Sequence, residues 1–147
     1  MQTSDILISL EHKYISAMML GDKTVELRRR PLRVPPGTRI WMYAKMPRGC
    51  VQLFATIKVV VEAPPEMIWR EYGSQTAVSR TDFRRYFNGA KSGCAIILSD
   101  ITELCRPVPL SEVRRRCSRF HPPQFFKRLR AGGPEVRLLL GAAALVR

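Results

Sequence analysis

The chain has 147 residues, which argues for one domain, and 46% of them are hydrophobic, which is enough for a packed core. Charged residues make up 25% of the sequence, so its composition is not that of an intrinsically disordered chain. The 25 basic residues exceed the 12 acidic ones and leave a formal net charge of +13. This surplus predicts a polyanionic partner.

Arginine dominates the basic residues, with 19 Arg against 6 Lys. The planar guanidinium makes bidentate contacts to phosphate and stacks on bases, so this bias favours nucleic acid. A GC-rich genome can also produce an Arg-rich protein, and composition alone does not separate the two explanations. Residues 74–147 carry 14 basic and 5 acidic side chains, whereas residues 1–73 carry 11 and 7. We therefore expect the second half of the chain to build most of a basic face.

Neither end of the sequence predicts a membrane or secretion segment. The first residues lack the basic and apolar stretches of a signal peptide. The apolar tail Leu138–Val146 is too short to span a bilayer as a helix. We expect a cytoplasmic protein with no membrane partner.

The cysteines do not follow a metal-binding pattern. They are widely spaced, contain no C-x-x-C and lie at positions 50, 94, 105 and 117. Neither His12 nor His121 stands at a ligand spacing from them. Two disulfides are conceivable, but without an export signal we expect buried thiols, with no metal and no cofactor.

Apolar spacing predicts the first elements. Ile6–Leu10 is a short apolar run that suits a buried strand, and Lys13–Leu20 has helical spacing with Gly21 as its C-cap. Lys23–Arg28 alternates polar and apolar residues, as a half-buried strand does. A period of two would place Lys23 with Val25 and Leu27 on one face, and Thr24, Glu26 and Arg28 on the other.

The rest of the chain reads as further short elements. A basic, proline-broken loop covers 29–36 and a turn covers 36–38. We expect strands at 39–45, 50–62, 94–98 and 101–105, and helices at 65–72 and 82–87. A cap at Ser79 would start the second of these helices, and 107–130 is expected to be loop with one or two short helices. The fold class is therefore α+β: a small, partly open β-barrel of five to six strands with flanking helices, with its core at about 6–105 and a helical extension at about 107–147.

Roughly residues 6–62, and more loosely 94–104, resemble ASCH domains, which belong to the PUA-like superfamily. The motif G-x-K-x-x-E-x-R is present as Gly21, Lys23, Glu26 and Arg28, after an apolar strand and a helix. The segment from Pro36-Gly37 to Tyr43-Ala44 is similar to the family's next strand. The resemblance implies a PUA-like barrel of mostly antiparallel strands, with a cleft beside the first helix and the Lys23–Arg28 strand.

The same resemblance implies a function in that cleft. Family members are proposed to bind RNA or modified nucleotides there. One branch hydrolyses N4-acetylcytidine with a Lys and a Thr near this strand and a Glu from a later helix, and another branch is reported as ribonucleases. Here Lys23 matches the lysine, but Thr24 directly follows it, and no motif assigns the later carboxylate. Glu71 and Asp82 are candidates by position only.

Lys23, Glu26 and Arg28 are the central candidates. In a cleft, Glu26 could accept hydrogen bonds from a base edge while Arg28 pairs with a phosphate. A partly desolvated Lys23 would have a lowered pKa and could act as a base or as an activator. Alternatively, the strand is a surface strand on which Glu26 and Arg28 simply pair with each other.

Further basic and aromatic residues are candidates for nucleic-acid contacts. Arg29 and Arg30, followed by Arg33, lie on a loop that could track a phosphate backbone. Tyr43 shares a strand face with Trp41, which we assign to the core, and Lys45 follows on the same side. Arg80 and Arg84 would share one face of a helix, next to Arg85.

A last basic run, at 114–116 and 119, precedes three phenylalanines. Basic residues interleaved with aromatic ones suit single-stranded RNA. The alternative is that Phe120, Phe125 and Phe126 pack the end of the chain onto the barrel, and we favour it for at least two of them.

The leading functional hypothesis is recognition of RNA, single-stranded or modified, by a basic cleft centred on Lys23, Glu26 and Arg28. DNA is a possible partner. The alternative is a hydrolase that acts on a nucleobase amide or a phosphodiester, with Lys23 as base or activator and Glu26 as acid/base or orienting group. The third class is a protein-interaction module, which would need neither the charge of Lys23 nor that of Glu26.

Overall fold

The computed structural model describes residues 5–144. Its elements, in chain order, are β1 (Asp5–Leu10), α1 (His12–Met19), β2 (Val25–Arg28), β3 (Arg39–Ala44), β4 (Cys50–Ala63), α2 (Pro65–Tyr72), a short 3-10 helix (Gly73–Gln75), α3 (Arg80–Tyr86), β5 (Gly93–Pro109), α4 (Leu110–Arg116), β6 (Lys127–Leu129) and α5 (Pro134–Ala143).

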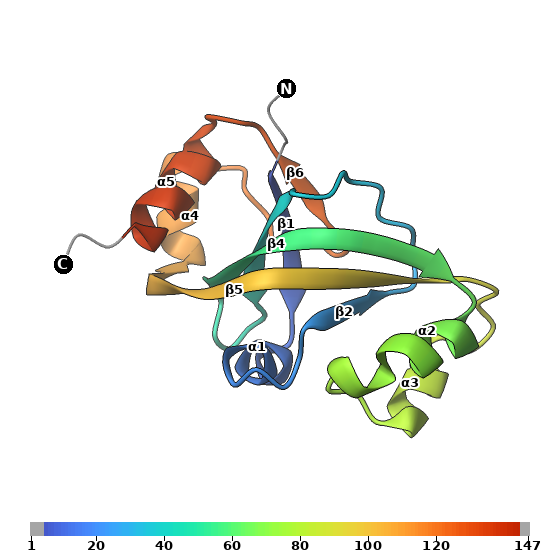
Figure 1. Cartoon of the computed structure of the whole chain (residues 1–147). Helices are drawn as coiled ribbons and strands as arrows, with labels where there is room; N and C mark the ends of the chain where they lie inside the picture. Colours follow the sequence, from blue (N-terminus) through green and yellow to red (C-terminus); the bar gives the residue numbers. More distant parts are fainter. Residues whose placement is uncertain (1–4, 145–147) are drawn as a thin grey trace.

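The strands form one mixed sheet in the order β2-β5-β4-β3-β1-β6 (Figure 1). β1 pairs with β3 in parallel, and the other neighbours are antiparallel. Within the described residues no pairing joins the two outer strands, β2 and β6, so the sheet stays open. This architecture confirms the predicted α+β class and its mostly antiparallel strands.

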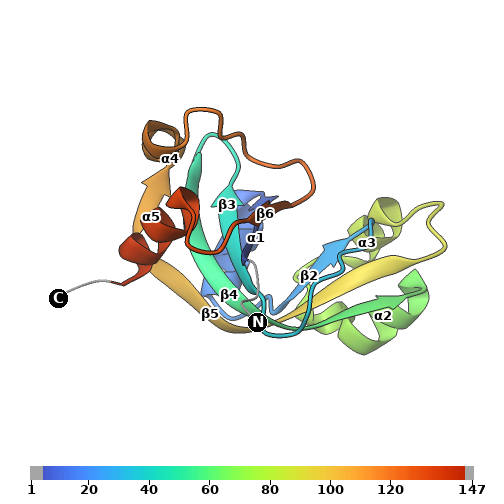
Figure 2. The same ribbon diagram turned by 90° about the horizontal axis from the view of Figure 1, so that it is seen from above.

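The long strands β4 and β5 connect two groups of helices. In both ribbon views α4 and α5 lie at one end of this strand pair, and α2 and α3 lie at the other (Figures 1 and 2). Helix α1 packs near the middle of the sheet, against β3 and β5. The pocket described below lies between α1 and α3.

Strand alternation divides the core between the two faces of the sheet. Ile6 and Ile8 of β1 join the cluster that contains Ile15 and Met18 of α1. Leu7, between them, joins a second cluster with residues of α4 and α5. A third cluster packs α2 and α3 against β2 and β5. Each helix is therefore fixed by the apolar face that it buries.

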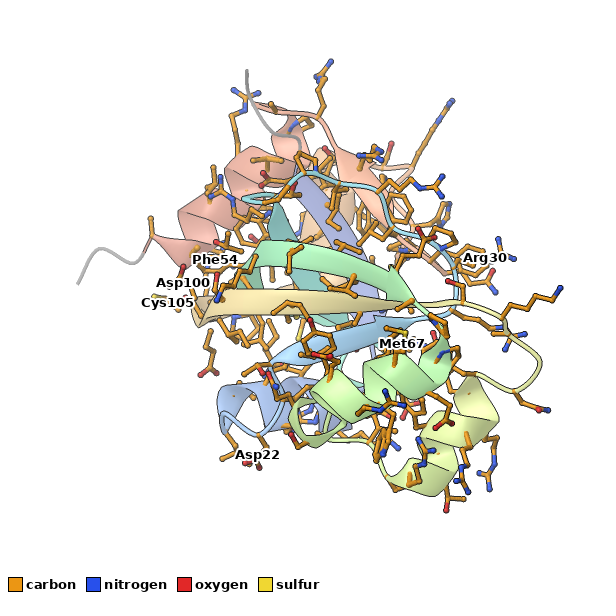
Figure 3. All side chains as sticks on the ribbon, turned by 45° about the vertical axis from the view of Figure 1, so that its right-hand side comes forward. Asp22, Arg30, Phe54, Met67, Asp100 and Cys105 are labelled. Atoms are coloured by element: carbon orange, nitrogen blue, oxygen red, sulfur yellow. The ribbon has the colours of Figure 1, made fainter. Side chains whose placement is uncertain are left out.

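Three local predictions are wrong. The strands expected at 94–98 and 101–105 form one strand, β5, whose pairing with β4 shifts register around Asp100, where φ is +53°. Figure 3 labels Asp100 and Cys105 on this strand and Phe54 on β4. The segment 107–130 was expected to hold no strand, yet it ends in β6, which pairs with β1. Lys23 precedes β2, so the period of two does not apply to it.

The cysteines are unpaired thiols. Cys50 and Cys94 are buried as expected, but Cys105 is exposed and Cys117 is partly exposed. Among residues 5–144, no helix is both long and apolar enough to cross a membrane. Residues 145–146, the end of the apolar tail, lie outside the described residues.

Candidate functional site

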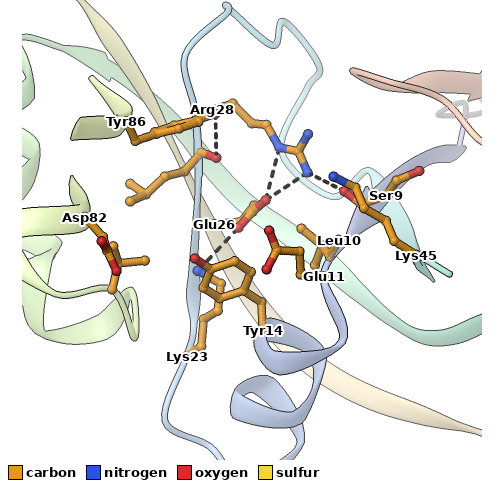
Figure 4. A pocket seen from close by; sticks show the side chains of 12 residues that line it. Ser9, Leu10, Glu11, Tyr14, Lys23, Glu26, Arg28, Lys45, Asp82 and Tyr86 are labelled. Carbon is orange, nitrogen blue, oxygen red and sulfur yellow. Dashed lines mark hydrogen bonds and ion pairs between the residues drawn. The ribbon is translucent and has the colours of Figure 1, made fainter. Parts of the chain in front are cut away.

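A pocket of about 220 Å³ opens where β2 passes between α1 and α3. Its floor is formed by the motif residues Lys23, Glu26 and Arg28 (Figure 4). The loop before α1 and that helix form one wall, and α3 forms the opposite wall. The sequence motif therefore lies at a real concavity, as the resemblance implied.

Glu26 is the centre of the pocket. Its buried carboxylate lies between two cations: Oε1 is 3.3 Å from Lys23 Nζ, and Oε2 is 2.9 Å from Arg28 Nη2. Arg28 Nε also donates to Oε2, at 3.1 Å. Contacts with two cations fix the direction of this buried carboxylate.

Lys23 is enclosed, with an exposed fraction of 1%. Its ammonium donates to the carbonyl oxygens of Thr76, at 2.7 Å, and Val25, at 3.0 Å, and its third contact is Glu26. The Tyr14 ring centroid is 5.0 Å from Nζ. Burial lowers the pKa of Lys23, while Glu26 opposes that shift.

These contacts correct the predicted faces of the strand. Lys23 lies with Glu26, and not with Val25 and Leu27, because it turns inward from the segment before β2. Two carbonyl oxygens accept hydrogen bonds from Lys23 Nζ, and Glu26 Oε1 forms an ion pair with it. In this arrangement Lys23 holds Glu26 in place.

Arg28 joins the pocket floor to two other parts of the chain. Nη2 donates to the Ser9 carbonyl oxygen at 3.1 Å, and Nη1 donates to the Phe125 carbonyl oxygen at 3.3 Å. The pairing of Glu26 with Arg28, which the sequence left as an alternative, is present. It occurs in a pocket, however, and not on a solvated strand. One Nη1 hydrogen of Arg28 has no partner among the described residues.

The walls add further polar groups. Tyr86 Oη accepts from the Arg29 backbone N–H at 3.0 Å and donates to the Leu27 carbonyl at 3.5 Å, and burial raises the pKa of this hydroxyl. Exposed Asp82 and Glu11 also line the pocket. Of the two later carboxylates suggested by position, the structure brings Asp82 to the site and leaves Glu71 outside it.

Lys45 also lines the pocket, whereas Tyr43 does not. Tyr43 is buried in the core cluster beneath α4 and α5, together with Trp41, so the shared face of these two aromatics is confirmed. Lys45 does not stay on their side, because β3 ends at Ala44 and strand alternation no longer fixes the next side chain.

The remaining predicted residues lie outside the pocket. Arg29 donates to the carbonyl oxygens of Tyr86 and Asn88, and the Arg30 guanidinium stacks over Phe125. Arg80 pairs with Glu66 at 2.7 Å and contacts the Trp69 ring, in a neighbouring depression. Arg84 follows on α3 and is exposed.

Sequence reasoning missed several pocket residues, among them Tyr86 and Ser9. Tyr86 comes from a helix distant in sequence, and no local pattern marks it. Tyr14, which lies within the helix expected at Lys13–Leu20, also lines the pocket. Its position in the helix that precedes the motif was the one available signal.

Both the sequence and the structure are similar to those of known proteins. An ASCH domain-containing ribonuclease of Zymomonas mobilis is 33% identical over 126 residues, which cover 86% of this chain and 84% of that protein. The chain belongs to the ASCH family. The crystal structure of ASCH from Zymomonas mobilis superposes with a TM-score of 0.89 at 31% identity, covering 97% of this chain and 98% of that one.

More distant structures share the fold alone. The human THYN1 protein, solved in complex with 5-methylcytosine-containing DNA, aligns over 99% of this ASCH chain and 100% of its own at a TM-score of 0.56 and 12% identity. The scan against family models gave no match. Membership of the ASCH family therefore follows from the similarity to the Zymomonas protein and from the fold.

Proposed function

We propose that this ASCH protein is a ribonuclease and that the pocket around Glu26 holds the RNA at the bond to be cut. The ribonuclease description of the Zymomonas relative supports the activity. The observation that carries the proposal is the buried Glu26 carboxylate, held between Lys23 and Arg28 at the floor of an open pocket. The net charge of +13 favours a polyanionic substrate.

In the proposed reaction, Glu26 takes the proton of a ribose 2′-hydroxyl, and that oxygen attacks the adjacent phosphorus. The bond from phosphorus to the 5′-oxygen breaks, which leaves a 2′,3′-cyclic phosphate, and the departing oxygen takes a proton from solvent. The free Nη1 hydrogen of Arg28 and the Lys45 ammonium at the mouth would stabilise charge on the phosphate. Lys23 is a positioning residue that holds the Glu26 carboxylate in place.

The test is an incubation with short single-stranded RNAs, read by intact mass. Glu26→Gln should lower turnover by orders of magnitude and leave RNA binding largely intact, because binding depends mainly on the surrounding cations. Asp82→Asn is the matched control, since Asp82 is a second carboxylate in the same pocket. Because Glu26 is buried, the unfolding midpoint of each variant is recorded alongside. Glu26→Asp keeps the negative charge and tests whether a shorter carboxylate still supports turnover.

Two results would contradict this assignment. Loss of cleavage in Asp82→Asn with full activity in a folded Glu26→Gln variant would move the proton acceptor to α3. Loss of an acetyl group from RNA that carries N4-acetylcytidine, with the chain uncut, would show the amidohydrolase activity in place of the ribonuclease.

The second candidate is recognition of RNA or a modified nucleotide without chemistry. It is favoured by one observation: Lys23 Nζ is already held by two carbonyl oxygens and by Glu26, which leaves it little freedom to act as a base. It predicts unchanged RNA masses together with saturable binding. Lys45→Ala would then weaken that binding and reduce its salt dependence.

A further inference from the structure

Residues 121–126, which we call the strap, connect α4 to β6 and are tied to the pocket floor. Ser9 Oγ donates to the Pro123 carbonyl oxygen at 2.8 Å, and Arg28 Nη1 donates to the Phe125 carbonyl oxygen at 3.3 Å. Both bonds use the strap backbone. The tie to the pocket floor therefore does not occupy the side chains of the strap.

The aromatic side chains around the strap are not buried alike. Phe120, just before it, is buried with an exposed fraction of 2%, and Phe126 packs against the core cluster that includes β1. These two confirm the packing expected from the sequence. Phe125 differs, because 42% of it is exposed to solvent.

A guanidinium covers one side of the Phe125 ring. Arg30 Cζ is 3.8 Å from the ring centroid, and Arg30 itself is exposed at the edge of the molecule (Figure 3). Phe120 is buried and Phe126 is partly buried against the core, so packing does not explain an aromatic left open to water. Aromatic rings and arginine planes are the surfaces on which unpaired nucleobases stack.

We propose that Phe125 and Arg30 form a stacking subsite for a nucleobase of single-stranded RNA, next to the nucleotide held in the pocket. The inference rests on the proposed RNA substrate and extends it to a second base. The subsite adjoins the pocket, because the Arg28 guanidinium contacts both the Glu26 carboxylate and the Phe125 carbonyl. Only the Arg28 side chain therefore separates a base stacked on Phe125 from the Glu26 carboxylate.

The surrounding charge favours RNA as the occupant. Arg128 contacts the Phe126 ring of the strap and donates to the Arg33 carbonyl oxygen at 3.1 Å, so one more arginine lies against the strap and a second lies next to it in turn. Arg33 is partly neutralised by Glu62, at 3.7 Å, whereas the described residues give Arg30 no carboxylate partner. An exposed ring among cations is suited to a base that carries its own phosphate.

The test measures affinity by fluorescence anisotropy on short single-stranded RNAs in which one abasic position is moved along the chain. The wild-type protein should bind about tenfold more weakly when the base at one particular position is missing. Phe125→Ala should bind the intact RNA about as weakly and be indifferent to that abasic position, while Phe125→Trp restores the preference. Leu140→Ala is the control, since it truncates a comparably exposed apolar side chain on α5.

Arg30→Lys separates charge from stacking. It keeps the positive charge and removes the plane, so it should lose part of the abasic discrimination with little change in salt dependence. Intact mass recorded after each titration reports cleavage separately from affinity.

Equal binding of intact RNA by wild type and Phe125→Ala, or the same abasic penalty in both, would overturn the subsite. If the RNAs stay uncut while the Phe125-dependent preference holds, the ribonuclease proposal fails and the subsite stands. If wild type binds none of these RNAs, both proposals fail.

Discussion

Replacing Lys23 with methionine tests the claim that its ammonium is a structural centre of the pocket. Methionine has a similar length and can fill the space, so the change removes mainly the charge and its donors. The Thr76 and Val25 carbonyl oxygens would each lose a buried donor, at about 1–3 kcal/mol each.

Two further effects oppose each other in this variant. Glu26 loses one of its two cations but keeps Arg28, so the cost is below the roughly 3–5 kcal/mol of a fully orphaned buried charge. Removing the charge also relieves the desolvation of a buried ammonium. We therefore expect Lys23→Met to lower the free energy of unfolding by about 3 kcal/mol, which corresponds to roughly 10 °C in Tm for a chain of this length.

Lys13→Met is a matched control in urea unfolding. Lys13 Nζ also lies 5.0 Å from the Tyr14 ring centroid and 3.6 Å from a glutamate, Glu11, but its side chain is 64% exposed. The midpoint of Lys13→Met should equal that of the wild type. If Lys23→Met unfolds within about 1 kcal/mol of the wild type, or if the two variants lose equal stability, the structural role of Lys23 is refuted.

Three smaller predictions follow from local contacts. Ser79→Ala removes the side-chain oxygen that accepts from the Asp82 N–H at 3.1 Å, so it should cost about 1 kcal/mol in urea unfolding, and Ser79→Asp should retain the cap. Gly93→Ala would place a Cβ 2.5 Å from the ring of buried Phe87, so it should lower Tm through a loss of about 1–3 kcal/mol, and an unchanged Tm would contradict the packing there. Because burial lowers the pKa of Lys23, the unfolded chain holds this proton up to about pH 10.5 while the folded chain releases it at lower pH. Wild-type stability should therefore rise relative to Lys23→Met as pH increases through the window below 10.5, and a constant difference across pH would contradict this linkage.

Apolar periodicity was sufficient to locate most of the fold. β1 is buried along its whole length, and α1 buries Ile15 and Met18 at helical spacing, so both carry their pattern in the local sequence. β6 could not be found in this way. It has three residues, two of them basic, and it becomes a strand only because β1 offers a free edge more than a hundred residues earlier.

The motif located the floor of the pocket but not the directions of its side chains. The sequence identified Lys23, Glu26 and Arg28 as one site, yet the face of Lys23 depends on where β2 begins, and strand ends are poorly defined by pattern alone. The carbonyl of Thr76 that holds its ammonium belongs to the turn before α3. No spacing near the motif could indicate that partner.

The arginine run 28–30 shows why a charge cluster in sequence is weak grounds for a phosphate track. Arg28 turns inward to Glu26, Arg29 turns to the end of α3, and Arg30 stacks on Phe125. Three neighbouring side chains at the end of β2 thus contact the pocket floor, the end of α3 and the strap, in that order.

For the proposed RNA substrate, this division of contacts leaves few groups at the pocket that can bind a phosphate. Most donors of Arg28 hold the pocket together, and Arg29 lies outside it. Among the described residues that line the pocket, this leaves the free Nη1 hydrogen of Arg28 and the exposed Lys45 to meet a phosphate. Such a site would make few ionic contacts, so the affinity for the proposed RNA would come in part from its bases. An exposed aromatic ring beside the pocket, at Phe125, is the kind of surface that could supply it.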